Sequence, residues 1–258
     1  MIDQALLNSF VKAHPFYGEL FYFEEIPSTN DFAKKTECKA NSLVLTSFQS
    51  SGRGRYDRKW ISAPDENLTF SLKLKLDLSP AENRYLIYFT SLMVYECIKE
   101  ILEFKVESSA ALSIKWPNDI LWNNRKLAGI LTESVVKSGE YIIGIGININ
   151  QKNFGSAIEA VSISEITNQF HDLNSVLVHF LTKFEKKIQM LEKENYPLLF
   201  DLWKKSTRMI GKKCSFLSAN ASLKHGFIKD LNEDGSITIE SAGVSASYIS
   251  GEVKILNY

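Results

Sequence analysis

Hydrophobic and polar residues alternate along the first part of the chain in patterns typical of strands. Residues 20–26, 43–48 and 67–76 are rich in Phe, Tyr, Leu, Val and Thr, and the third run alternates strictly from Leu68 to Leu76. A period of two is typical of a strand with one buried face and one face in water. We therefore expect three strands, the third with its polar side chains in solvent.

A long helical pattern follows. Ser79-Pro80-Ala81-Glu82 has the form of a capping box with proline at the first helical position. An apolar stripe at helical spacing continues it for about six turns, through Leu86, Phe89, Leu92 or Met93, Cys97 and Ile101. The pattern predicts a helix that starts at Pro80.

The chain then returns to strand-like runs, at Leu112–Trp116, Ile120–Trp122, Arg125–Val136 and Tyr141–Asn150. Asn123-Asn124 favours a primed hairpin turn between the second run and the third. Lys126 would lie beside that turn, where its long side chain can reach into a cleft.

The sequence pattern changes in the last part of the chain. Residues 175–194 and Tyr196–Ser206 show helical patterns, but from Gly211 onward short strand-like pieces alternate with turn residues. This predicts a small antiparallel barrel of about fifty residues. We expect an α+β fold with a central mixed or antiparallel sheet flanked by helices, and two domains, residues 1–209 and 210–258.

Composition excludes several classes of protein. The 258-residue chain carries 30 basic and 30 acidic residues, and this balance argues against bulk binding to DNA or to an acidic membrane. The three cysteines, Cys38, Cys97 and Cys214, show no spacing typical of a disulfide framework or a zinc site. No signal-peptide pattern and no apolar run of membrane-spanning length occurs. We expect neither DNA nor a membrane as a partner, and the cytoplasm as the compartment.

Positive charge is nevertheless concentrated in one short segment. Gly52–Trp60 contains three arginines, a lysine, two glycines and a tryptophan. Glycines let a backbone approach a ligand, guanidinium groups bind phosphate or carboxylate oxygens, and an indole offers a flat face for a base. Three further unusual clusters follow at Lys115–Asp119, Arg125–Leu131 and Gly144–Asn148. The segment Gly52–Trp60 therefore indicates a loop for an anionic ligand.

Familiar nucleotide and hydrolase motifs are absent from the sequence. A dinucleotide fingerprint would need glycine where Asp57 and Ile149 stand, and no P-loop motif or Gly-x-Ser-x-Gly elbow occurs. The four histidines lie outside the clusters without metal-ligand spacing. Neither a histidine-based triad nor zinc chemistry is expected.

The remaining cations, amides and tryptophans suit chemistry that joins two anions. A carboxylate that attacks the α-phosphorus of ATP approaches a group of like charge, and fixed cations with Mg²⁺ offset this repulsion. The resulting acyl-adenylate is already activated, so that the next transfer needs no nucleophilic cysteine or serine.

These residues resemble the motifs of the biotin protein ligase family. Gln49–Trp60 is similar to the family's Gly-Arg-Gly-Arg-x-Gly-Arg-x-Trp signature, with Ser28-Thr29-Asn30 upstream and the later clusters in the same order. The resemblance is strong over residues 20–150. In the C-terminal part it rests only on the pattern of short strand-like pieces and turn residues. It implies a class II synthetase-like catalytic domain and a small SH3-like barrel.

The implied activity is that of a biotin–[acetyl-CoA-carboxylase] ligase. Biotin and ATP, with Mg²⁺, would give biotinyl-5′-AMP and pyrophosphate, and biotin would then pass to a lysine of a biotin carboxyl carrier protein of a biotin-dependent carboxylase. A homodimer is compatible with the sequence.

The resemblance also implies a role for each matching residue. Four would be catalytic: Lys126, Arg53, Arg55 and Asp119. The biotin site would comprise Ser28, Thr29, Asn30, Gln49, Gly52, Arg53, Gly54, Arg55, Lys126 and Gly129. The nucleotide site would comprise Arg55, Arg58, Trp60, Lys115, Asn118 and Asn148. No protein-bound metal is expected, and Asn118 and Asp119 would act in the second step or beside a metal.

Two features depart from the family pattern. Asp57 stands where the family usually has glycine, so the loop would close differently or Asp57 would pair with a neighbouring arginine. The chain also begins almost at the catalytic domain, and about twenty residues cannot form the N-terminal DNA-binding domain of some relatives. Repressor activity is therefore not expected.

Plainer interpretations of the same residues remain open. Ser28 can cap a helix, Trp116-Pro117 can be purely structural, and Gly144 and Gly146 can mark a strand packed closely on another backbone. A lipoate or octanoate ligase of the same superfamily is one alternative function. A non-enzymatic nucleic-acid-binding module is another, against which zero net charge and the lack of a second basic stripe count.

Overall fold

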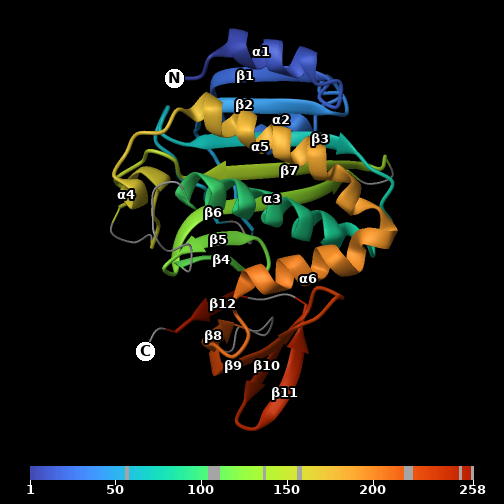
Figure 1. The fold of residues 1–258 in the computed structure, drawn as a ribbon, viewed down its shortest axis with the longest axis vertical. Helices are drawn as coiled ribbons and strands as arrows, with labels where there is room; N and C mark the ends of the chain where they lie inside the picture. The colour runs from blue at the N-terminus through green and yellow to red at the C-terminus, as the bar shows by residue number, and fades with distance from the viewer. Residues whose placement is uncertain are drawn as a thin grey trace.

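The computed structural model describes residues 1–55, 58–103, 111–135, 138–155, 159–217, 223–249 and 252–256. Two sheets follow one another along the long axis of the molecule (Figure 1). The larger sheet carries helices on one face, and the smaller sheet forms the C-terminal end. Asp57 lies outside the described residues, as does the expected strand end at Val136.

The large sheet has seven strands in the order β1-β2-β3-β7-β6-β5-β4. Their bounds are β1 Glu19–Ile26, β2 Ser42–Gln49, β3 Leu68–Lys75, β4 Leu112–Lys115, β5 Asp119–Trp122, β6 Arg125–Val135 and β7 Glu140–Ile147. β1 pairs with β2 in parallel, and every other pair is antiparallel. The sheet is therefore mixed, and the expected fold class is confirmed.

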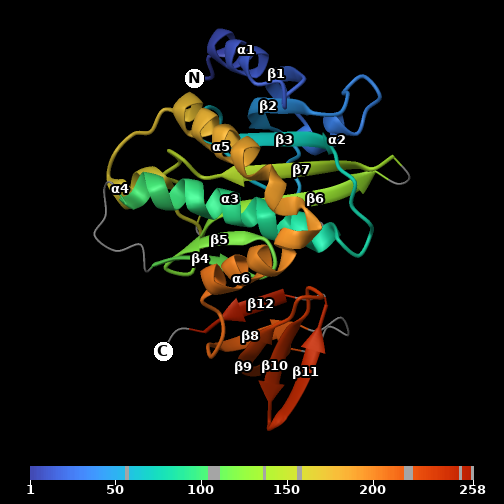
Figure 2. The ribbon, with the colours of Figure 1, turned by 45° about the vertical axis from the view of Figure 1, so that its right-hand side comes forward.

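The helices cover mainly one face of this sheet (Figures 1 and 2). Their bounds are α1 Gln4–Ala13, α2 Thr29–Ala33, α3 Asn83–Glu103, α4 Ile163–Thr167, α5 Leu173–Lys187 and α6 Tyr196–Thr207, with 3-10 turns at Ile188–Leu191 and Lys193–Asn195. Phe70 of β3 meets Phe180 of α5 edge to face at 5.5 Å between ring centroids, and Phe89 of α3 meets Phe184 at 4.9 Å. This aromatic layer fixes the helices to the sheet. Within the described residues, no helix combines the length and apolar character needed to cross a membrane.

The long helix begins later than the capping box predicts. The Ser79 backbone N–H does donate to Glu82 Oε2 at 2.7 Å, as in such a box. However, the same segment forms a separate turn, in which the Glu82 N–H donates to the Ser79 carbonyl, and α3 itself starts at Asn83. The start expected at Pro80 is therefore wrong by three residues.

The alternation in β3 also has a different meaning from the one expected. Every residue from Leu68 to Leu74 is buried, and even Lys73 is only 4% exposed, with Nζ donating to the Cys38 carbonyl at 2.7 Å. The expectation of a wet face is wrong because β3 lies between β2 and β7 and its polar face is covered by α2 and its surroundings. The polar side chains of β3, Thr69, Ser71 and Lys73, therefore form a polar surface inside the protein.

The C-terminal sheet is antiparallel, with strand order β11-β10-β9-β8-β12. Its strands are β8 Lys213–Leu217, β9 Leu223–Leu231, β10 Ile237–Ser241, β11 Val244–Tyr248 and β12 Glu252–Ile255. Trp116 Nε1 donates to the Gly235 carbonyl at 2.9 Å and joins the two sheets. The predicted boundary after residue 209 falls in the connection between α6 and β8, and it stays a prediction.

Candidate functional site

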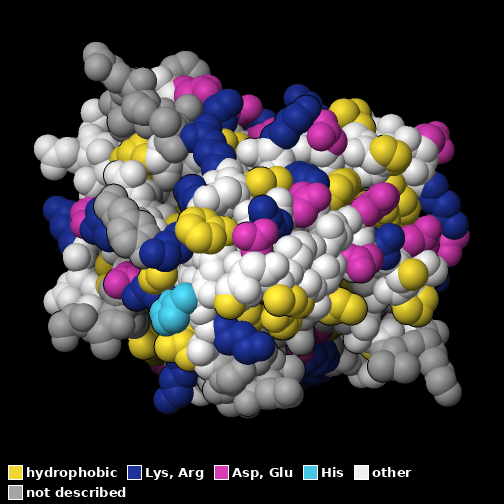
Figure 3. Space-filling model, turned by 90° about the horizontal axis from the view of Figure 1, so that it is seen from below, with side chains coloured by type: hydrophobic (Ala, Val, Ile, Leu, Met, Phe, Trp, Pro, Cys, Tyr) yellow, Lys and Arg dark blue, Asp and Glu magenta, His cyan; other side chains and the backbone are white. Residues whose placement is uncertain are grey.

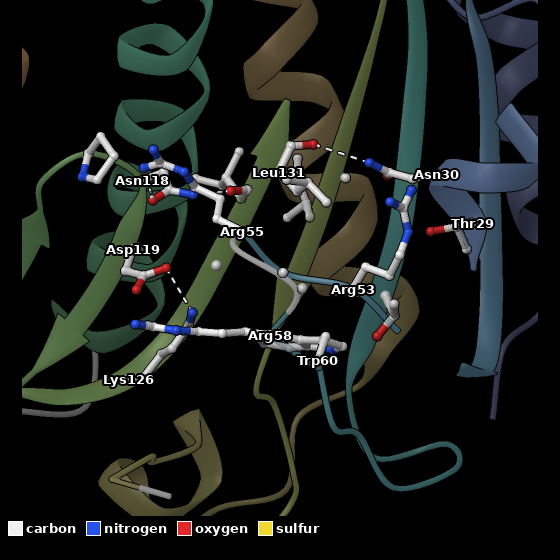
Figure 4. A pocket seen from close by; sticks show the side chains of 18 of the residues that line it. Thr29, Asn30, Arg53, Arg55, Arg58, Trp60, Asn118, Asp119, Lys126 and Leu131 are labelled. Atoms are coloured by element: carbon white, nitrogen blue, oxygen red, sulfur yellow. Dashed lines mark hydrogen bonds and ion pairs between the residues drawn. The ribbon is translucent and has the colours of Figure 1, made fainter. Parts of the chain in front are cut away.

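A cavity opens on the face of the large sheet opposite α3 and α5 (Figure 4). It encloses about 880 Å³ of space when its open mouth is included. Side chains from α2, the loop after β2, and strands β3 to β7 line it, and Val253 of β12 adds a contribution from the small sheet.

Two glycines of β7 make the floor of the cavity flat. A Cβ at Gly144 would overlap the side-chain amide of Asn30, and a Cβ at Gly146 would overlap the indole of Trp60. Both glycines therefore leave room for a side chain to lie on the sheet. The interpretation of a strand packed on another backbone is replaced by one of a strand packed beneath two side chains.

The short helix α2 positions the polar residues at one end of the cavity. Ser28 caps it, with its side chain accepting from the Asp31 N–H, so that the helical turn presents Thr29 and Asn30 to the sheet. The Thr29 N–H donates to Gln49 Oε1 at 2.7 Å. Thr29 and Asn30 are buried, at 2% and 4% exposed, so their side chains are held rigidly.

Ser71 completes this polar group from β3. Its Oγ lies 2.7 Å from Thr29 Oγ1 and 2.6 Å from Asn30 Oδ1. Thr29 Oγ1 in turn lies 3.0 Å from Gln49 Oε1. Four oxygens, from Asn30, Ser71, Thr29 and Gln49, therefore form a continuous line, which we call the oxygen line.

The opposite end of the cavity is cationic. Lys126 Nζ lies 2.8 Å from Asp119 Oδ1 and 5.8 Å from the centroid of the Trp60 ring. Gly129 lies beneath it, since a Cβ there would come within 3.0 Å of Lys126 Nζ. Lys126 thus projects over the sheet into the cavity, as expected from its place beside the turn (Figure 4).

The backbone around Lys126 explains this direction. Asn123 and Asn124 both have positive φ, 46° and 63°, as a primed turn requires. The register of β5 and β6 then shifts by one residue at Leu127. The Lys126 N–H donates to the Glu159 carbonyl at 2.8 Å, and its carbonyl accepts from the Val161 N–H at 2.9 Å. This extra pairing anchors the base of the side chain.

The arginine loop folds back on itself over the cavity. The Gly54 N–H donates to the Arg58 carbonyl at 2.7 Å, and the Trp60 N–H donates to the Gly52 carbonyl at 2.9 Å. Arg55 Nη1 reaches Asn118 Oδ1 at 3.5 Å, while the Asn118 amide donates to the Ile130 carbonyl. Arg53 points the other way, toward Asn30 (Figure 4).

Nearly all the residues expected at the site line this one cavity: Ser28, Thr29, Asn30, Gln49, Arg53, Gly54, Arg55, Arg58, Trp60, Lys115, Asn118, Asp119, Lys126 and Gly129. Gly52 and Asn148 do not. Gly52 packs behind the loop, where a Cβ would come within 2.6 Å of the Trp60 carbonyl. Asn148 is 3% exposed and donates to the carbonyls of Lys126 and Val161, which supports Lys126 from behind.

Several residues at the cavity are not expected from the sequence. Thr69, Leu131 and Val253 line it, and Ser71 belongs to the oxygen line beneath. The polar positions of the β3 alternation were the signal for Thr69 and Ser71, but they were interpreted as solvent-facing. No local pattern indicates Val253, because it reaches the cavity only through the packing of the small sheet.

Comparison with known proteins places this site in a family. Residues 21–150 match the model of the biotin/lipoate A/B protein ligase family. Since the match covers half of the chain and contains the loop, the oxygen line and the cationic end, the chain belongs to this family. The expected family and the class of ligases are therefore confirmed.

Individual relatives agree with this assignment. The chain is 26% identical to the bifunctional ligase/repressor BirA of Escherichia coli, over 92% of this chain and 74% of BirA. It is 27% identical to a biotin–[acetyl-CoA-carboxylase] ligase of Paracoccus denitrificans, over 82% of this chain and 90% of the relative. A solved biotin protein ligase of Aquifex aeolicus, in complex with biotin and ATP, is 27% identical with a TM-score of 0.77, over 94% of this chain and all of that one.

Proposed function

We propose that this protein joins biotin to AMP, with ATP as the donor, and transfers the biotin to a lysine of a biotin carboxyl carrier protein. The observation that carries the proposal is the polarity of the cavity, which has the oxygen line at one end and cations at the other. A molecule with N–H donors at one end and a carboxylate at the other, which describes biotin, matches both ends.

The oxygen line favours a ligand that donates hydrogen bonds. The Thr29 N–H donates to Gln49 Oε1, and Asn30 Nδ2 donates to Glu133 Oε2 at 2.8 Å, so both terminal amides turn their oxygens to the hydroxyls. Two hydroxyl protons then serve three oxygen–oxygen contacts, because carbonyl oxygens cannot donate. One contact always lacks a proton, and an N–H from a ligand relieves this deficit.

Biotin and lipoate differ in the hydrogen-bond donors that they would bring to the oxygen line. The ureido ring of biotin carries two N–H groups, whereas the dithiolane ring of lipoate carries none. A buried acceptor without a donor costs about 1–3 kcal/mol. The proposed site therefore favours biotin over lipoate, which is the alternative within the family.

The cationic end suits the activation step. The carboxylate of biotin would attack the α-phosphorus of ATP, form a carbon–oxygen–phosphorus bridge and release pyrophosphate. The Lys126 ammonium and the guanidinium groups of Arg55 and Arg58 line the same end and would offset the charge of the meeting anions. Asp119, 2.8 Å from Lys126 Nζ, would orient the ammonium. Trp60 would offer its indole face to the adenine, and Lys115 and Asn118 would hold the nucleotide.

Mg²⁺ would enter with the nucleotide. In the part of the chain that the structure describes, no group of three or more His, Cys, Asp or Glu residues is placed to hold a metal ion. Mg²⁺ commonly keeps several waters and binds through phosphates with one or two carboxylates. Asp119 is the carboxylate of the cavity lining that would meet it.

The transfer step needs no nucleophile from the protein. The amine of the carrier lysine would attack the carbonyl carbon of the mixed anhydride, form an amide and release AMP. Until then water must be kept from the anhydride, which gives the loop over the cavity a function.

A nucleic-acid-binding module is the less favoured function. In the view of Figure 3, basic and acidic side chains are interspersed and form no single basic stripe on the visible face. Family membership also favours an enzyme.

Pyrophosphate exchange tests the proposal. Labelled pyrophosphate should enter ATP when biotin is present, and lipoate should not replace biotin. A purified biotin carboxyl carrier domain should then become biotinylated at one lysine. Exchange driven by lipoate alone would move the assignment to the other branch of the family, and exchange with neither acid would overturn the activity.

A further inference from the structure

Arg53 is held at the rim of the cavity by two carboxylates from separate elements. Its Nη2 lies 2.5 Å from Asp31 Oδ1 on α2 and 3.4 Å from Glu133 Oε2 on β6. Lys34 lies between the same two carboxylates, 3.4 Å from Asp31 and 2.8 Å from Glu133. The guanidinium of Arg53 is thus engaged by the protein on the side away from Lys126 (Figure 4).

We propose that Asp31 and Glu133 are positioning residues that hold the segment Gly52–Arg55 across the cavity through Arg53, and so retain the activated intermediate. The intermediate itself rests on the proposed function. In this arrangement the Arg53 side chain links its own segment to α2 and β6 through ion pairs with Asp31 and Glu133, and it does not bind the substrate carboxylate. We call these two ion pairs the tie.

The two ends of the segment support this interpretation. Arg53 is tied to α2 and β6, and two residues later Arg55 Nη1 reaches Asn118, which precedes β5. Because the oxygen line lies at the α2 end and Lys126 at the β5 end, Gly52–Arg55 crosses the space between them. A bound intermediate that joins both ends would lie beneath the segment.

The charges around Arg53 explain why position 53 needs a cation. Two carboxylates, Asp31 and Glu133, face two cations, Lys34 and Arg53. Burial raises the pKa of Glu133, but Lys34, Asn30 and Arg53 lower it more, so that its net pKa lies below the ordinary value and it is charged at neutral pH. If Arg53 left, both carboxylates would share Lys34 alone.

The tie is also weak enough to open. The side chains of Arg53 and Asp31 are 41% and 52% exposed, and pairs with this exposure are screened by salt and contribute little each. Substrate entry and product release require such an opening. Asp31 and Glu133 differ in one respect, since Glu133 also accepts from Asn30 Nδ2 and so connects the tie to the oxygen line.

Limited trypsin digestion measures the tie without any chemistry, because Arg53 and Arg55 are themselves cleavage sites. Asp31→Asn and Glu133→Gln should each raise the rate of cleavage within Gly52–Arg55 by about 1.5- to fivefold at low salt, as expected for the loss of exposed ion pairs. Glutamine keeps an acceptor for Asn30, so the second variant removes charge alone. At about 1 M salt the wild-type rate should rise toward that of the variants.

Glu165→Gln is the matched control. Glu165 pairs with Arg125 at 2.9 Å, with side-chain exposures of 33% and 45%, away from the loop. Its cleavage rate should equal that of the wild type. Equal rates for Asp31→Asn, Glu133→Gln and wild type would overturn the tie, whatever the enzyme does.

Intermediate retention provides the second readout. Asp31→Asn should still support biotin-dependent pyrophosphate exchange, yet label bystander lysines several-fold more than wild type does when no carrier is present. The charge-reversed pair Asp31→Arg with Arg53→Asp should restore retention, while Asp31→Arg alone should not.

The two failures are distinguishable. If wild type shows no exchange, the proposed function fails, and the trypsin result still decides whether the tie exists. If wild type exchanges normally and Asp31→Asn retains the intermediate as wild type does, the positioning role is wrong.

Discussion

Lys126 owes its place in the cavity to several independent features of its neighbours. The shift in register at Leu127, the absence of a side chain at Gly129 and the ion pair with Asp119 all act on one ammonium group. A cation held in this way needs little reorganisation when charge develops in a transition state.

Lys126→Met tests this residue, because methionine keeps the apolar stem and removes the charge. We expect biotin-dependent pyrophosphate exchange to fall about 10²–10³-fold, the usual effect of losing one group that stabilises developing charge. Asp119 would add to the loss, since its carboxylate would then face the phosphates without a partner. Arg125→Met is the control, because Arg125 pairs outward with Glu165. Near-normal exchange by Lys126→Met would remove Lys126 from the catalytic residues.

The residue types at the site could be predicted from the sequence because the chemistry limits them. Cations, amides and glycines in four clusters are rare together, and their clustering indicated a shared anionic ligand before any geometry was known. The partner of each side chain could not be predicted. Arg53 meets Asp31 and Glu133 only because α2 and β6 converge at the rim, and Trp60 lies on Gly146 only through the pairing of strands.

At the scale of elements, local patterns predicted where strands and helices lie better than they predicted which face is buried. The alternation in β3 has the period of a strand, but sequence alone does not show that both faces are covered. Ser71 was assigned to water for this reason, although it lies between Thr29 and Asn30. The helices α1 and α4 were not predicted, although α1 buries Leu7 and Val11 at the four-residue spacing of a helix face.

The pairing of α3 with α5 depends on charge as well as on aromatic packing. Lys183 lies 2.6 Å from Glu100 and 3.6 Å from Glu96, and His179 lies 2.8 Å from Glu100. Burial raises the pKa of Glu100, but Lys183 and His179 lower it by more than burial raises it. The net pKa of Glu100 therefore lies below the ordinary value of 4.5. A carboxyl with a lowered folded-state pKa stabilises the fold above its unfolded pKa, and this stabilisation is lost as the pH falls through the folded value.

Glu100→Gln should therefore lower the free energy of unfolding at pH 7 by at most about 1 kcal/mol, because the carboxylate is 41% exposed. The difference from wild type should vanish at a pH below the lowered pKa, where the wild-type carboxyl is protonated. Urea unfolding at neutral and acidic pH measures this. Glu103→Gln is the control, since its pair with Lys99 lies within α3. A difference that persists in acid would mean that Glu100 acts through packing rather than charge.

At the scale of the whole molecule, the small sheet is held by polar contacts from the end of β4, from α3 and from α6. Trp116 Nε1 donates to the Gly235 carbonyl, Tyr85 Oη donates to Glu233 Oε1 at 2.5 Å, and Lys204 pairs with Asp230 at 2.5 Å. Val253 of the small sheet lines the cavity. The position of the small sheet therefore determines part of the cavity wall.

Trp116→Phe tests this coupling, because it removes the hydrogen bond to Gly235 while keeping an aromatic ring. Losing the bond should lower the free energy of unfolding by about 0.5–1.5 kcal/mol beyond the packing loss, which is the net contribution of one hydrogen bond, because the contact is only partly buried. Trp203→Phe is the comparison in which no hydrogen bond is lost, because the Nε1 of Trp203 has no hydrogen-bond partner among the described residues. Equal losses of stability in the two variants would show that the hydrogen bond to Gly235 does not help to hold the small sheet.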